Sequence, residues 1–131
     1  MPKINGILET ALYVEDIERS VEFYKSVFGF QEIDASPRLS AMGVVPRQVL
    51  LLFKKEASAH LPLTPHDGSG QVHLAFAIAA SELEAWETWL PKCAIAIEER
   101  KTWERGGTSL YFRDPDGHLL ELATPGVWSI Y

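Results

Sequence analysis

Three side chains that can bind a metal interrupt otherwise apolar segments of this chain. They are Glu9, His73 and Glu121. If each segment is a β-strand, its side chains alternate between two faces, so Glu9 shares a face with Ala11 and Tyr13. A carboxylate buried on an apolar strand is costly unless it is paired, protonated or bound to a metal. One histidine and two carboxylates form an open coordination set for a divalent cation.

The same three residues also have an explanation without a metal. Glu9 would then pair with an arginine, and His73 would be a core histidine with its hydrogen bonds satisfied. The residue pattern alone does not choose between these two interpretations.

The first of these residues lies at the start of a predicted β-α-β-β-β unit. A strand is predicted over residues 7–14. A helix should begin after Asp16, a favourable N-cap residue, and end before Gly29. Three further strands are predicted over residues 30–35, 39–45 and 47–54.

A loop at residues 55–70 separates this unit from a second set of elements in the same order. A strand is predicted over residues 71–79. Ser81 and Glu84 suggest a capping box for the next helix, which Pro91 should stop. The remaining strands are predicted over residues 94–99, 107–113 and 118–124.

The last two strands should form a hairpin around Asp114-Pro115-Asp116-Gly117, a sequence typical of turns. A regular hairpin would pair Arg113 with His118. Leu110 and Phe112 would then lie on the same face as Glu121.

The two units align without gaps at their first strands, where residues 9–14 lie over 73–78. Their last strands align as residues 49–52 over 119–122. Such repetition predicts an α+β fold in which two tandem βαβββ units form a curved mixed sheet with the helices outside. We expect a single domain over residues 1–131. Its parts are a unit at 6–54, the loop at 55–70, a unit at 71–124 and a tail at 125–131.

Composition limits the classes of function. The net charge of −6 argues against nucleic acid as a partner, and no apolar run reaches the ~20 residues that a membrane helix needs. The first residues show no leader sequence, and the lone Cys93 fits a reducing compartment, so we expect a cytoplasmic protein. The apolar tail at 127–131 should pack, within the chain or across a dimer.

Two stretches resemble the opening and closing motifs of the vicinal oxygen chelate superfamily, which includes glyoxalases, bleomycin-resistance proteins and extradiol dioxygenases. The opening is residues 12–24, ending at Phe28-Gly29-Phe30, and the closing is residues 110–122. With residues 73–76, the resemblance covers essentially the whole chain. It is specific for the superfamily and does not identify the member.

The resemblance implies that Glu9, His73 and Glu121 bind a divalent metal. Many members have histidine where this chain has Glu9, and a fourth ligand of glyoxalase I falls at Leu51, which cannot bind metal. Both departures argue against glyoxalase I itself. The metal can be iron, manganese, zinc, nickel or magnesium, although a carboxylate-rich set favours the harder ions.

These observations predict a metal-dependent lyase, isomerase or dioxygenase, which acts as a homodimer on a small oxygen-chelating substrate. Glu121 or Glu9 would serve as the catalytic base, and Tyr13 is a weaker candidate for proton donor. Two alternatives remain open: a protein that sequesters a small molecule without chemistry, as bleomycin-resistance proteins do, and a dimeric scaffold with no open cavity.

Overall fold

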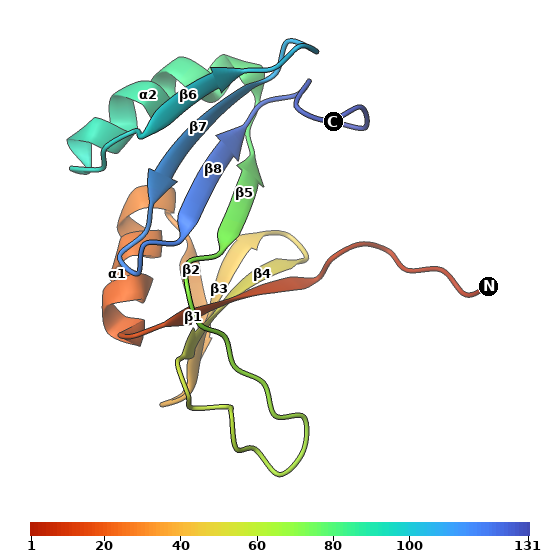
Figure 1. Ribbon diagram of the computed structural model, residues 1–131, viewed down its shortest axis with the longest axis vertical. Helices are drawn as coiled ribbons and strands as arrows, with labels where there is room; N and C mark the ends of the chain where they lie inside the picture. The colour runs from red at the N-terminus through yellow and green to blue at the C-terminus, as the bar shows by residue number, and fades with distance from the viewer. The chain divides into compact units, whose positions relative to one another are not determined.

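The computed structural model describes residues 1–131 and divides into two compact units. Unit 1 is Met1–Gly70 and unit 2 is Gln71–Tyr131. The boundary falls where the sequence predicts that the second copy begins. Each unit contains a four-stranded mixed sheet and one α-helix, so the predicted fold class is confirmed (Figure 1). That the two units form one domain stays a prediction.

Unit 1 follows the predicted order of elements, and its sheet has the strand order β1-β4-β3-β2. The strands β1 and β4 are parallel, and the other neighbours are antiparallel. The elements are β1 (Glu9–Val14), α1 (Ile17–Phe28), β2 (Gln31–Ala35), β3 (Leu39–Val45) and β4 (Gln48–Lys54).

The helix α1 has the predicted ends. The Asp16 carboxylate accepts a hydrogen bond from the Arg19 backbone N–H at 3.0 Å, which satisfies one N–H group that the helix leaves unpaired. Gly29 ends the helix in the left-handed conformation, with φ of 71°. The buried face of α1 includes Val21, Tyr24 and Val27.

Unit 2 repeats the same topology with the strand order β5-β8-β7-β6. Its strands β5 and β8 are parallel, as β1 and β4 are in unit 1. The elements are β5 (His73–Ala77), a 3₁₀ turn η1 (Ala80–Glu82), α2 (Leu83–Lys92), β6 (Glu99–Thr102), β7 (Thr108–Arg113) and β8 (Leu119–Ala123).

The predicted boundaries around α2 are wrong in two places. The expected capping box does not form, because Ser81 belongs to η1 and no side chain caps α2. Pro91 lies inside the helix, which ends at Lys92; in the last turn its missing N–H removes a single hydrogen bond.

The strand predicted at residues 94–99 is also wrong, because β6 begins at Glu99. Ala94 has a φ of 59°, and the Ile95 N–H donates back to the Leu90 carbonyl at 3.0 Å. Ala94 and Ile95, which were predicted to begin the strand, therefore form a chain reversal at the end of α2.

Strand pairing confirms the internal repeat at the level of single residues. Ala11 pairs with Leu51 in unit 1, and Ala75 pairs with Glu121 in unit 2. Leu51 and Glu121 are therefore equivalent positions in the two copies. Only unit 2 has a potential metal ligand there.

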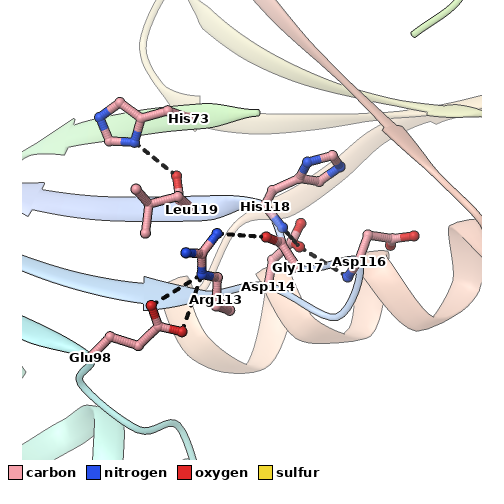
Figure 2. Close-up of polar contacts among 8 residues, drawn as sticks. All are labelled: His73, Glu98, Arg113, Asp114, Asp116, Gly117, His118 and Leu119. Atoms are coloured by element: carbon pink, nitrogen blue, oxygen red, sulfur yellow. Dashed lines mark hydrogen bonds and ion pairs between the residues drawn. The ribbon is translucent and has the colours of Figure 1, made fainter. Parts of the chain in front are cut away.

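The hairpin between β7 and β8 has a different register from the predicted one. Arg113 pairs with Leu119 rather than with His118. The Gly117 N–H donates to the Asp114 carbonyl at 3.0 Å, and Gly117 itself has a φ of 80°. This is a turn followed by a left-handed residue, which adds one residue to the loop and shifts the register by one. Figure 2 shows the Asp114 carboxylate accepting hydrogen bonds from the backbone of Asp116 and His118 inside the loop.

A shift of one residue moves every side chain of a strand to the opposite face. Tyr111, and not Leu110 or Phe112, therefore pairs with Glu121. Leu110 and Phe112 are fully buried in the core of unit 2. The expectation that they line the face of Glu121 is wrong.

Substituting alanine for Gly117 should destabilise the protein by about 1–2 kcal/mol, because a side chain disfavours the left-handed backbone that sets this register. Urea unfolding would measure the loss. Gly43→Ala is the matched control, since Gly43 has ordinary backbone angles and its added Cβ would meet only ordinary contacts. Equal stabilities for the two variants would show that the left-handed residue does not hold the hairpin.

The apolar tail was predicted to pack, and it does so only in part, within unit 2. The Tyr131 hydroxyl donates to the carbonyls of Ile78 and Ala123, at 3.0 and 3.2 Å. Val127 is buried, whereas Trp128 and Ile130 remain exposed. No helix has the length and apolar character needed to span a membrane.

Candidate metal centre

Unit 2 brings His73 and Glu121 together. His73 Nδ1 lies 3.0 Å from the Leu119 carbonyl oxygen, a contact visible in Figure 2, and Nε2 lies 3.1 Å from Glu121 Oε2. A carbonyl oxygen only accepts hydrogen bonds, so Nδ1 carries a proton. In neutral His73 the Nε2 lone pair therefore points at the carboxylate.

Glu121 is held on its other side by a short chain of hydrogen bonds. The Ser109 hydroxyl donates to Glu121 Oε1 and accepts from Trp103 Nε1 at 2.8 Å. Only 5% of Glu121 is exposed, so the orientation of its carboxylate is set by these protein contacts. Ser109 was not a predicted site residue, because its role depends on the pairing of β7 with β8.

These contacts fit part of a metal site, because they bring together two of the three predicted ligands. The Nε2 atom of neutral His73 and the Glu121 carboxylate are both acceptors, so a cation or a proton must lie between them. A metal-binding histidine usually donates its other N–H to a carbonyl or carboxylate, as His73 does to Leu119. Ligands about 2.1 Å from one ion at a right angle are about 3.0 Å apart, close to the observed separation of His73 from Glu121. About half of the His73 side chain is exposed (49%), which leaves the pair accessible to an ion. His73 is therefore not the core histidine of the alternative interpretation.

Tyr111 is a further polar residue at this pair, and the sequence analysis missed it. Its ring centroid lies 6.2 Å from that of His73. Partial burial raises the pKa of Tyr111 above its usual value, and the nearby charges of Glu121 and Glu99 raise it further, while a hydrogen bond with Ser109 acts in the opposite direction. The hydroxyl is therefore protonated at neutral pH. With the correct hairpin register, Tyr111 would have been predicted to lie beside Glu121.

Glu9, the third predicted ligand, lies on β1 of unit 1. Its side chain is exposed and forms no ion pair with an arginine, contrary to the alternative interpretation. Neither unit by itself brings together three histidine, cysteine or acidic side chains in a metal-binding arrangement. The role of Glu9 as a ligand stays a prediction.

Tyr13, the weaker catalytic candidate, also belongs to unit 1. Its hydroxyl lies 2.7 Å from His66 Nδ1, a partner that was not predicted. His118 has a structural role in unit 2, where it is buried and its Nδ1 accepts from the Val72 N–H at 3.1 Å.

The comparisons with known proteins identify the family of the chain. The family model of the Glyoxalase/Bleomycin resistance protein/Dioxygenase superfamily matches residues 6–122, so the chain belongs to this superfamily. The family predicted from the sequence motifs is confirmed.

Particular relatives show how the family likeness extends over the chain. Metallothiol transferase FosB of Bacillus licheniformis is 31% identical over 96% of this chain and 79% of its own. The crystal structure of a lactoylglutathione lyase from Agrobacterium tumefaciens has a TM-score of 0.91 at 31% identity and covers 98% of this chain and 99% of its own. The fosfomycin resistance protein FosX from Listeria monocytogenes, at 19% identity and a TM-score of 0.72 over 95% of this chain and 97% of its own, shares the fold. The transferase and the lyase are enzymes by name, which agrees with the prediction of an enzyme.

Proposed function

We propose that this chain is a metal-dependent enzyme that acts on a small substrate with two neighbouring oxygen atoms. His73 and Glu121 would bind a divalent cation, and Glu9 would complete the ligand set, from the same chain or from a second copy. The observation that carries this proposal is the His73–Glu121 pair, whose two facing acceptor atoms are held in place by Leu119 and Ser109. The names of the relatives support an enzyme over a sequestering protein.

The bound metal would hold the substrate oxygens and stabilise negative charge that develops on them. The protein supplies the groups that move protons. Glu121 is fixed by Ser109 and His73, whereas Glu9 is exposed and makes no ion pair, so Glu9 is the better candidate to leave the metal and act as the catalytic base. Protonated Tyr111 would donate a hydrogen bond to the substrate beside Glu121. Tyr13, already paired with His66, stays the weaker candidate for proton donor.

The charge of the proposed ligand set bears on which metal it binds. Two carboxylates and a neutral histidine cancel the charge of a divalent ion. Such a centre is a weaker Lewis acid than one with two histidines, and it favours manganese, magnesium or iron(II) over zinc or nickel.

We also propose that the protein is a cytoplasmic homodimer. Unit 1 exposes several large apolar side chains that association would bury, namely Ile7, Leu8, Ile33 and Val45. Cys93 is a free thiol, which suits a reducing compartment.

Metal uptake tests the proposed function. The purified chain, loaded with Mn²⁺ and then desalted, should keep a near-stoichiometric amount of metal by elemental analysis, and His73→Ala should lose it. His60→Ala is the matched control, because His60 is exposed in the loop after β4. A wild-type protein that takes up no metal, or a His73→Ala variant that keeps it, would overturn the proposal. Unchanged uptake by Glu9→Ala would remove Glu9 alone from the ligand set.

A further inference from the structure

Unit 1 contains a half-buried arginine that no carboxylate neutralises. Arg38 lies just before β3, and its Nη1 donates to the hydroxyl of the buried Ser58 at 2.8 Å. Its guanidinium carbon lies 5.4 Å from the ring centroid of Phe53. Serine and phenylalanine leave the positive charge uncompensated, although the chain as a whole has a net charge of −6.

His66 approaches the same two residues from the loop after β4. Its ring centroid lies 4.6 Å from that of Phe53, and its backbone N–H donates to the Ser58 carbonyl at 3.2 Å. When the Tyr13 hydroxyl donates to Nδ1, the ring proton of neutral His66 is on Nε2. Nε2 forms no hydrogen bond in the structure, so it is an available donor on a ring that packs, like Arg38, against Phe53.

The surrounding contacts hold this group in place. Tyr13 stacks on Phe53 with 5.7 Å between ring centroids, and Gly68 packs so closely on Tyr13 that a Cβ atom would not fit. The carboxylate of Asp67 accepts from the Glu56 N–H at 3.1 Å, which ties the two ends of the loop together. The donors are therefore preorganised before any ligand arrives.

An oxyanion is the ligand that fits this arrangement. A guanidinium has five N–H donors in a planar fork, and Ser58 uses only one of its nitrogens. A partly desolvated charge is costly without a counter-charge, and arginine binds carboxylates and phosphates through paired hydrogen bonds. We propose that Arg38 and His66 form a binding site for the carboxylate or phosphate group of a small molecule. This site needs no metal, so the outcome of its test does not depend on the proposed metal centre.

Titration with inorganic phosphate and, separately, with acetate tests this site. In ¹H–¹⁵N NMR spectra of the full chain, the Arg38 side-chain and His66 ring signals should shift and saturate with at least one of the two anions. The stronger response identifies a phosphate or a carboxylate as the preferred group. Arg38→Met should weaken binding about ten-fold or more, because it removes charge-assisted hydrogen bonds while keeping the length of the side chain.

Two variants separate binding from support of the loop. Arg105→Met changes an exposed arginine in unit 2 and should bind the anions as the wild type does. Arg38→Lys keeps the charge but not the fork, so it should keep part of the affinity if Arg38 contacts the anion. No saturable shift at Arg38 or His66 with either anion, or equal affinities for Arg38→Met and Arg105→Met, would overturn the proposal. If Arg38 only supported the loop and bound no anion, neither anion would give a saturable shift at Arg38 or His66.

Discussion

Replacing Glu121 with glutamine should lower the affinity for a divalent cation by more than about 100-fold. Changing a residue that only supports a metal ligand costs roughly 10–100-fold, and this substitution removes a ligand itself. Glutamine keeps the size of the side chain, and its oxygen can still accept the hydrogen bond from Ser109. What it loses is the negative charge beside His73 Nε2. Competition with a chromophoric chelator would measure the affinity.

The matched control for this variant is Glu98→Gln. Glu98 is an exposed acid of unit 2, and it pairs with Arg113 at 3.1 Å, away from His73 in the sheet (Figure 2). Its loss should leave metal affinity unchanged. If Glu121→Gln binds as tightly as Glu98→Gln, Glu121 is not a ligand, and the His73–Glu121 contact is an ordinary ion pair.

Truncating Phe112 to alanine should cost about 3–5 kcal/mol of unfolding free energy, the usual loss for a large buried aromatic residue. Phe112 is fully buried and lies opposite Leu120 in the hairpin register. Tyr111→Phe removes only a hydroxyl at a partly exposed position and should cost much less. Urea unfolding of both variants would measure the difference.

The same pair of variants tests the hairpin register. In the register predicted from the sequence, Phe112 would share the face of Glu121, and its truncation would affect metal binding more than stability. The structure predicts the reverse, since Tyr111 pairs with Glu121. A small stability loss in Phe112→Ala would contradict the observed register.

Most of the strands and the repeat could be predicted because their signals are local. Alternating apolar residues mark β1 and β8, and Asp16 and Gly29 mark the ends of α1 through their own backbone preferences. Where a local signal competes with chain reversal, as after α2, the prediction was wrong by several residues. The chain reversal after α2 extends to Ile95, and β6 begins only at Glu99.

The sequence by itself determined the two copies, the strand positions of Glu9, His73 and Glu121, and the family. Only the tertiary structure decided which side chains surround the His73–Glu121 pair. One left-handed residue, Gly117, sets the register of β7 on β8, and with it the choice of Tyr111 and Ser109 over Leu110 and Phe112. Because side chains alternate along a strand, a single residue in a loop can move all of them between the two faces of the sheet. The alternation of Ser109 and Tyr111 with Leu110 and Phe112 agrees with the observed register, but the turn sequence was given more weight in the prediction.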